Sequence, residues 1–259
     1  MARADRREAG GLMSVPDRPE GALIEAARDA TPVGIATLAP PGGLLIVAPH
    51  PDDETLGCGM ALAAAAAAGR RIAILLLTDG EGSHPGSRLF PEDKRRALRR
   101  RELARALAML APGRRIRVWA AHCPDGASAA HARDEDLFRS ALGAARGNGT
   151  RAVWSTWGGD PHCDHEAAAD LAARLARELG AAHWSFPVWG RFGSREVPAH
   201  IRLFAKRRFA PAKRAAMAAH ASQMTDLIDD VPDGFVMPPA LAAHFQTHPE
   251  IFIHERGPD

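Results

Sequence analysis

Short apolar runs alternate with polar and amphipathic stretches along most of the chain. Residues 44–48 are wholly apolar, which is typical of a strand buried on both faces of a sheet. The same pattern predicts further strands at residues 72–77, 116–120, 152–156 and 182–188. Helices are predicted between them at residues 56–68, 91–111, 134–145 and 164–179. Because strands and helices alternate, we expect a Rossmann-like α/β fold, an open and mostly parallel sheet with helices on both faces.

The two ends of the chain depart from this alternation. After residue 190 the pattern predicts strands at residues 201–204 and 251–254, with a helix at residues 211–221. Residues 1–40 are polar and rich in Gly and Pro, and one short helix is expected near residues 22–30. The sequence therefore predicts an N-terminal extension over residues 1–40 and a single folded domain over residues 41–259.

Composition narrows the class of protein. The chain has 259 residues, 46% of them apolar, so it can bury a sizeable core and is not disordered over most of its length. Its 33 Lys and Arg nearly balance its 31 Asp and Glu, and we expect no nucleic-acid partner; the basic run at residues 94–101 is interpreted as a solvated helix face. Three scattered cysteines imply no disulfide framework, and no apolar segment is long enough to span a bilayer or to act as a secretory signal. A cytoplasmic protein that acts on a small molecule is the expectation.

Candidate chemistry lies in the loops after the first and fourth predicted strands. In open α/β sheets, ligands bind at the carboxyl ends of the strands. Residues 49–54 (Pro-His-Pro-Asp-Asp-Glu) follow the first strand, and residues 160–166 (Asp-Pro-His-Cys-Asp-His-Glu) follow the fourth. The side chains of His50, Asp53 and His165 would make a three-ligand site with one position left for water, as a catalytic zinc requires.

The other acidic and imidazole groups of the two loops are candidate catalytic residues. If Asp53 faces a metal, the adjacent Asp52 can face the water and act as general base. His162 precedes His165 by three residues at a helix entrance, so the two imidazoles can converge, and Asp164 can orient an imidazole. Taken alone, this second motif is as consistent with an ordinary helix N-terminus near Asp164. The metal interpretation depends on the two loops together.

The motifs at residues 49–54, 56–59 (Leu-Gly-Cys-Gly) and 162–165 (His-Cys-Asp-His) resemble those of the PIG-L/LmbE-like metal-dependent de-N-acetylases. This family includes N-acetylglucosaminyl-phosphatidylinositol deacetylase. Its weaker landmarks are matched by Thr-Asp-Gly-Glu at 78–81, Arg99 with Glu102, Pro-Asp-Gly at 124–126 and His-Ala-Ser-Gln at 220–223. The resemblance runs from about residue 44 to residue 255, and the folded domain is accordingly identified as a PIG-L/LmbE-like deacetylase domain.

The resemblance implies a role for each matching residue. The metal ligands fall on His50, Asp53 and His165, with Zn²⁺ as the expected cofactor and Fe²⁺ or another divalent metal as the alternative. The general base falls on Asp52. The second histidine falls on His162, which as an imidazolium would donate a proton or hold the oxyanion, with Asp164 behind it.

Two features depart from the family pattern. Cys163 stands where the family usually has Pro between the motif histidines. The chain also contains no tyrosine, a residue that some members place near the scissile carbonyl. Oxyanion stabilisation would then depend on the metal and His162.

Two further residues are candidates for substrate binding. Asp79 follows the second strand and is placed to reach a substrate, although a turn role beside Gly80 explains it as well. Arg88, in a loop at the rim of the site, would bind a hydroxyl or phosphate group, although a solvated loop arginine explains it somewhat better.

The sequence thus predicts a zinc-dependent hydrolase that removes an N-acetyl or N-acyl group from an amino sugar or glycoconjugate. The alternative is a non-catalytic α/β small-molecule-binding protein with a structural metal site, which would bind metal without hydrolysing amides. Two His and one carboxylate also suit a non-haem Fe(II) oxygenase, which would require oxygen. A dinucleotide site at Gly57 and Gly59 is rejected because the third glycine of that fingerprint is missing.

Overall fold

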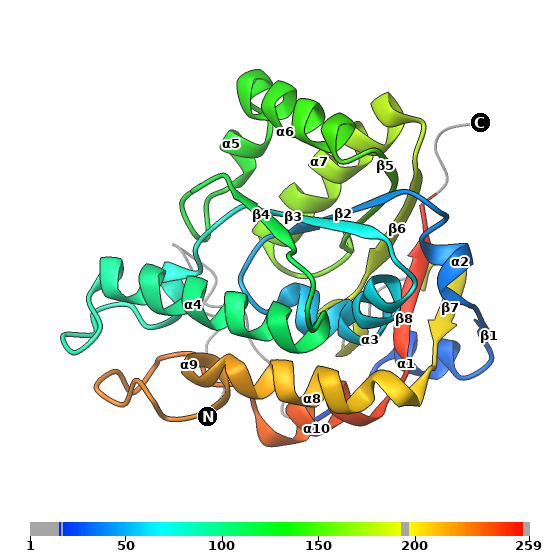
Figure 1. Cartoon of the computed structure of the whole chain (residues 1–259). Helices are drawn as coiled ribbons and strands as arrows, with labels where there is room; N and C mark the ends of the chain where they lie inside the picture. Colours follow the sequence, from blue (N-terminus) through cyan, green and yellow to red (C-terminus); the bar gives the residue numbers. More distant parts are fainter. Residues whose placement is uncertain (1–15, 17, 193–196, 256–259) are drawn as a thin grey trace.

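The structure is a computed structural model that describes residue 16, residues 18–192 and residues 197–255. In this part of the chain, eight strands form one sheet in the order β1-β7-β8-β6-β5-β2-β3-β4 (Figure 1). The strands are β1 (Thr31–Pro32), β2 (Gly43–Ala48), β3 (Arg71–Leu76), β4 (Arg117–Ala120), β5 (Thr150–Thr156), β6 (Ala182–Phe186), β7 (Ile201–Phe204) and β8 (Glu250–His254). The expected open α/β sheet is confirmed.

The strands that the sequence predicted before residue 190 form the parallel part of the sheet. β2 pairs in parallel with β3 and β5, β3 pairs with β4, and β5 pairs with β6. Every residue of β2 is buried, because helices cover both faces of the sheet at this strand. Beyond β6, β8 runs antiparallel to both β6 and β7, and β1 joins β7 in parallel. The sheet is therefore mostly, not wholly, parallel.

Helices cover the sheet on both sides (Figure 1). One side carries α3 (Asp53–Ala67), α4 (Glu92–Leu110), α8 (Ala210–Ala219) and α10 (Pro239–Thr247), and the other carries α5 (Ala129–Ala132), α6 (Glu135–Gly147) and α7 (Cys163–Leu179). The remaining helices are α1 (Ala22–Ala27), α2 (Ile35–Leu38) and α9 (Ala221–Met224). The sequence did not predict α2, α5 and α9, which have four residues each and are too short to show a helical period, and it also missed α10.

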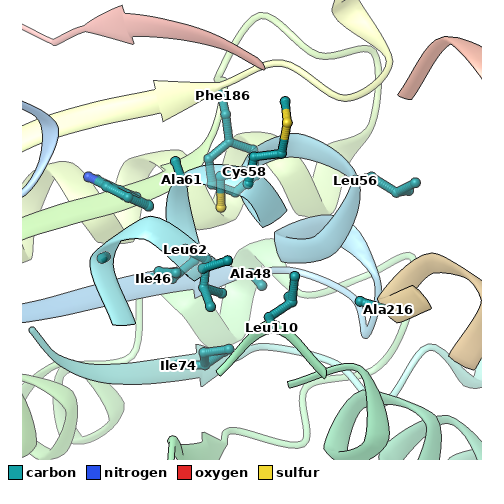
Figure 2. Close-up of a cluster of buried hydrophobic side chains, with 14 of the residues drawn as sticks. Ile46, Ala48, Leu56, Cys58, Ala61, Leu62, Ile74, Leu110, Phe186 and Ala216 are labelled. Carbon is teal, nitrogen blue, oxygen red and sulfur yellow. The ribbon is translucent and has the colours of Figure 1, made fainter. Parts of the chain in front are cut away.

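The larger hydrophobic core lies between the sheet and α3. Figure 2 shows Leu62 of α3 grouped with Ile46 of β2, Ile74 of β3 and Leu110 of α4. The small alanine side chains of α3 let the helix lie close to the strands, so that it is buried from Asp53 to Ala66. This burial explains why the segment has no amphipathic pattern in the sequence.

Gly57 is required where α3 passes over β6. A Cβ atom at this position would lie 2.1 Å from Cδ2 of Phe186, a distance that real side chains do not adopt. The glycine therefore serves helix-to-sheet packing, in agreement with the rejection of a dinucleotide fingerprint.

Part of the predicted N-terminal extension packs on the sheet. Leu23 and Ala27 of α1 form a buried cluster with Ile201 of β7 and Ile251 of β8, and Leu38 accepts a hydrogen bond from the Trp154 indole (2.9 Å) at its backbone oxygen. The proposed boundary at residue 40 stays a prediction, and residues 1–15 and 17 lie outside the described residues. Among the described helices, none is long and apolar enough to cross a bilayer.

A buried histidine on β6 predicts a specific loss of stability in acid. His183 is 9% exposed, with Nε2 3.4 Å from the Ser155 hydroxyl, and burial and the nearby His254 lower its pKa to about 4. Its pKa in the unfolded chain is about 6.5, so its contribution to stability is complete above that pH and is lost as the pH falls toward 4. Between pH 7 and pH 5 the wild type should lose about 1–2 kcal/mol more of its free energy of unfolding than His183→Gln.

Urea unfolding at the two pH values measures this difference, because titrations elsewhere cancel between the two proteins. The matched control is His131→Gln, which changes an exposed imidazole and should leave the loss unchanged. Equal losses in the wild type and His183→Gln would contradict the prediction.

Candidate metal centre and active site

The two sequence motifs meet because their strands are neighbours in the sheet. His50 lies in the loop after β2, and Asp53 is the first residue of α3. His165 lies in the first turn of α7, the helix that follows β5. β2 and β5 pair directly and in parallel, so their carboxyl ends lie side by side. Ligand atoms of His50, Asp53 and His165 all lie within 4.8 Å of one another, and all three residues are buried.

His165 has one occupied and one free ring nitrogen. Its Nδ1 lies 2.8 Å from Oδ2 of Asp160, while the buried Nε2 has no hydrogen-bond partner and lies 3.5 Å from Oδ1 of Asp53. A buried ring nitrogen without a partner is costly unless it binds a ligand. A carboxylate behind the opposite nitrogen is the usual arrangement of a metal-binding histidine. The residues present therefore fit a divalent metal.

Asp160 is itself fixed by the backbone after β6. Its Oδ1 accepts a hydrogen bond from the N–H of Gly190 (2.7 Å), and its Oδ2 accepts from the N–H groups of Val188 (2.9 Å) and Trp189 (3.2 Å). The sequence gives no indication of this role for Asp160, although the residue stands only two positions before the first histidine of the motif. Its partners are 28–30 residues away in the chain, and no local pattern marks them.

The ring of His50 lies among three carboxylates. Its Nδ1 is 3.1 Å from Asp53 Oδ2, and its Nε2 is 3.1 Å from both Asp164 Oδ2 and Asp125 Oδ1. Burial by itself lowers the pKa of His50, but these three carboxylates outweigh burial and raise it above its usual value. The same surplus of negative charge suits a cation at this place.

Asp164 contacts a different imidazole from the one that the sequence suggested. Its carboxylate lies against His50, whereas its backbone N–H, not its side chain, is bonded to His162. The carboxylate also accepts hydrogen bonds from the Gly126 N–H (2.7 Å), the Ser128 N–H (2.9 Å) and the Ser128 hydroxyl (2.7 Å). The hydrogen bond to His50 and the charge of that ring, together with the bonds from Ser128, hold the pKa of Asp164 well below the usual range despite burial. In the structure Asp164 orients His50, as does Asp125, for which the sequence suggested no role.

Asp52 and Asp53 are adjacent but lie in different electrostatic environments. Burial raises the pKa of Asp52 to about 7, although the Arg99 guanidinium, 3.1 Å from its Oδ2, opposes this rise. For Asp53 the effect of burial is outweighed by His165 and His50, and its pKa falls to about 2. A carboxylate that stays ionised suits a ligand, and one that titrates near neutrality suits a base.

The backbone at Asp52 separates the two side chains. Its φ of 134° is rare outside glycine, and Asp and Asn are among the residues that tolerate a positive φ best. Arg99 stabilises this conformation by donating to the Asp52 carboxylate, to the Pro51 oxygen (2.7 Å) and to the Gly80 oxygen (2.9 Å). Arg99 is thus a supporting residue of the site.

His162 lies at the N-terminus of α7 with its ring beside the other two imidazoles. The ring centroids of His162 and His50 are 4.8 Å apart, and those of His162 and His165 are 5.0 Å apart. Burial, together with the charges of His50 and His165, lowers the pKa of His162 to about 3. Nδ1 accepts the N–H of Asp164 (3.2 Å), so the neutral ring carries its proton on Nε2. The structure therefore favours a neutral N–H donor and not the imidazolium expected from the sequence.

Glu54 and His220 form a second buried layer below the motif. Glu54 is bonded to the Thr55 hydroxyl and to the Asp52 N–H (3.2 Å), and burial raises its pKa to about 7. Nε2 of His220 lies 3.4 Å from the Thr55 hydroxyl and 3.8 Å from Glu54 Oε1. Ser222 bonds to the Glu102 carboxylate through both its N–H and its hydroxyl, which ties α9 to α4. Glu54 and His220 thus brace residues 52–55.

Neither candidate substrate residue is joined to this cluster by a hydrogen bond or ion pair in the described part of the chain. The carboxylate of Asp79 is buried and accepts hydrogen bonds from Arg100 on both oxygens, with His122 Nδ1 3.0 Å from Oδ2. Arg88 is exposed, and its backbone N–H donates to Asp230 (2.7 Å). The environment of Asp79 favours an anchoring role, and substrate binding by either residue stays a prediction.

Comparisons with known proteins place this geometry in a known structural class. No curated protein sequence matches the chain. N,N'-diacetylchitobiose deacetylase from Pyrococcus horikoshii has a similar structure, with a TM-score of 0.54 and 16% identity over 72% of each chain. A triple mutant of a deacetylase of the teicoplanin biosynthetic pathway has a TM-score of 0.60 and 20% identity over 82% of this chain and 97% of that chain. A zinc-inhibited form of teicoplanin deacetylase has a TM-score of 0.56 and 20% identity over 81% of this chain and 96% of that one.

The same fold also occurs in an enzyme of another kind. GalB, the 4-carboxy-2-hydroxymuconate hydratase from Pseudomonas putida KT2440, has a TM-score of 0.58 and 21% identity over 70% of this chain and 80% of that one. At these identities the structures establish the fold, which alone does not select a reaction.

The family is established by sequence. Residues 45–176 match the family model PIG-L, described as GlcNAc-PI de-N-acetylase, and this match includes residues 49–54 and 160–166. The chain therefore belongs to the PIG-L family, and it is a hydrolase of the deacetylase class.

Proposed function

We propose that the protein is a zinc-dependent hydrolase that removes an N-acetyl or N-acyl group from an amino sugar or glycoconjugate. The observation that carries the proposal is the environment of His165, whose Asp160-bound ring leaves a buried, unpartnered nitrogen 3.5 Å from Asp53. The solved deacetylases of chitobiose and teicoplanin support a sugar-containing substrate, and the zinc-inhibited form of the latter supports a zinc-binding site.

In this proposal His50, Asp53 and His165 hold the metal. A divalent metal there supplies Lewis acidity, which polarises the amide carbonyl and acidifies water. Asp52 takes a proton from the water as the water oxygen attacks the carbonyl carbon. A carboxyl group with a pKa of about 7 is suited to that step. The Nε2–H of neutral His162 stabilises the negative charge that develops on the carbonyl oxygen.

The second half of the reaction returns the same proton. When the C–N bond breaks, Asp52 gives its proton to the leaving nitrogen, so that the products are an amine and a carboxylic acid, which ionises to a carboxylate by losing the second proton of the water to solvent. With His162 as the donor to the oxyanion, this scheme needs no tyrosine, and the chain contains none. Asp125 and Asp164 keep the ring of His50 in place throughout.

Metal content is the first measurement. Protein purified without chelator should carry about one zinc or iron per chain by mass spectrometry, and Asp53→Ala should lose it because a carboxylate ligand is removed. The exposed carboxylate of Asp93 provides the matched control, since Asp93→Ala should keep the metal. A wild type that holds no metal and takes up none on adding zinc would overturn the proposal.

Acetate release then separates hydrolysis from binding. N-acetylated mono- and disaccharides, including N,N'-diacetylchitobiose, are incubated with the metal-loaded wild type and with Asp53→Ala. Release by the wild type alone supports the proposal. Tight metal binding without hydrolysis of any N-acylated sugar would favour a binding protein with a structural metal site, and a requirement for oxygen would favour an Fe(II) oxygenase.

A further inference from the structure

Helix α3, which carries Asp53 in its first turn, is broken in the middle. Cys58 has φ −139° and ψ 21°, far from helical values, while the residues on both sides are helical. A break of this kind removes backbone hydrogen bonds that a continuous helix would make across it. In a regular helix the N–H of Met60 would bond to the oxygen of Leu56, and the N–H of Ala61 to the oxygen of Gly57.

Two side chains from distant elements take the place of the missing bonds. The carboxylate of Glu250, on β8, accepts hydrogen bonds from the N–H groups of Met60 (2.6 Å) and Ala61 (2.8 Å). The ammonium group of Lys213, on α8, donates to the oxygen of Leu56 (2.7 Å) and to Oε1 of Glu250 (2.8 Å). The Lys213–Glu250 pair therefore stands where the bond from Met60 to Leu56 would be.

The pair is buried at a place where charge is costly. Lys213 is 1% exposed and Glu250 is fully buried. A buried ion pair of this kind contributes little net stability compared with apolar side chains of the same size. In the described part of the chain, the hydrogen bonds of these two side chains go either to the backbone at the break in α3 or from Lys213 to Glu250. The structural effect of the pair is therefore to stabilise the break.

The break separates the first turn of α3, which begins at Asp53, from the rest of the helix. The part of α3 after Cys58 is the alanine-rich segment packed against the sheet, with Ala61 and Leu62 in the core (Figure 2). The part before Cys58 begins at Asp53 and leads back directly to Asp52. Leu56 also packs in the core, and the bonds of Leu56 and Met60 to the pair fix the angle between the two parts of the helix.

We propose that Lys213 and Glu250 are positioning residues that keep the first turn of α3 at the angle that places Asp53 toward His50 and His165. This inference rests on the proposed metal-dependent function. Without the pair, Met60 N–H and Leu56 C=O can bond to each other and close the break. The carboxylate of Asp53 then moves away from the two imidazoles, and the metal is held less tightly.

The test replaces both charges at once. In Lys213→Met/Glu250→Met, apolar side chains of similar length leave no unpaired charge, so the fold should persist. We expect the dissociation constant for zinc, measured by competition with a chromogenic chelator, to rise at least ~10-fold, as for other residues that support a metal ligand. The control is Leu142→Ala, a core truncation on α6 that touches neither motif, which should lower the melting temperature but leave the zinc affinity within ~3-fold. A folded double variant with the zinc affinity of the wild type overturns the inference.

A second measurement does not depend on metal. The Cα chemical shift of Cys58 in metal-free protein should move to the helical range in the double variant, and an unchanged shift overturns the inference. If the double variant does not fold, Lys213→Met serves instead, because it removes the donor to the Leu56 oxygen; an unchanged zinc affinity and Cys58 shift in that variant would again overturn it. Failure of the proposed function shows separately, as a wild type that binds no zinc or releases no acetate, and the Cys58 shift still decides the positioning role.

Discussion

Replacing Asp52 with Asn is expected to lower kcat/KM for deacetylation by about 10²- to 10⁴-fold, the range for loss of a general base. The bound metal should remain, because Asp53, His50 and His165 are untouched. Asn is well matched to this position: its side chain has the shape of Asp, and its amide oxygen can still accept from Arg99. Acetate-release kinetics and metal analysis of the same preparation measure the two effects.

Glu54→Gln is the informative comparison for this prediction. Burial raises the pKa of both Asp52 and Glu54 to about 7, so the pKa alone does not distinguish the two candidates. Their geometry does, because Glu54 is fully buried with both oxygens bonded within its own loop, whereas Asp52 is 6% exposed. Glu54→Gln should therefore retain much more activity than Asp52→Asn. Equal losses, or full activity in Asp52→Asn, would contradict the assignment of the base.

The grouping of His50, Asp53 and His165 could be predicted because it follows from local sequence and one rule of topology. His50 and Asp53 are three residues apart across the end of β2, so a single loop brings them together. His165 joins them only if β5 lies next to β2, and the parallel α/β pattern makes all strand ends meet at one edge. The sequence therefore placed the three residues at one edge of the sheet, and their direct contact depends on the pairing of β2 with β5, which it did not predict.

The supporting residues could not be predicted, because each depends on partners far away in the chain. Asp164 orients His50 across 114 residues, although its neighbour His162 was the obvious partner in sequence. Glu250 reaches Met60 across 190 residues, and a lone acidic residue just before a predicted strand gives no sign of this contact. Hydrogen bonds of this type are set by how β7, β8 and α8 pack, and hydrophobic periodicity carries no information about them.

The protonation state of His162 also could not be predicted from the sequence alone. The sequence indicates an imidazole near the site, and a positive charge is the simplest way for it to hold an oxyanion. Three imidazoles within 5.5 Å of one another, all buried or partly buried, make such a charge unfavourable. The backbone N–H at the start of α7 instead fixes which nitrogen carries the proton, and a neutral donor results.

Asp160→Asn is expected to weaken zinc binding by about 10- to 100-fold, the usual effect of losing the carboxylate behind a metal-binding histidine. Asp160 Oδ2 lies 2.8 Å from Nδ1 of His165, and it also accepts from the N–H groups of Val188 and Trp189, while Oδ1 accepts from Gly190. The NH₂ of an Asn would face a donor at either position. We therefore also expect the free energy of unfolding to fall by about 1–3 kcal/mol, the cost of an unpaired buried donor.

The matched control is Asp134→Asn. Asp134 also accepts two backbone N–H groups, those of Asp136 and Leu137, but it does so at the exposed start of α6, where Asn caps a helix as well as Asp. Its zinc affinity should equal that of the wild type. The two effects of Asp160→Asn have different causes and can be measured separately, by chelator competition and by urea unfolding. A variant that lost stability but kept its zinc affinity would show that Asp160 braces residues 188–190 and does not orient the ring of His165.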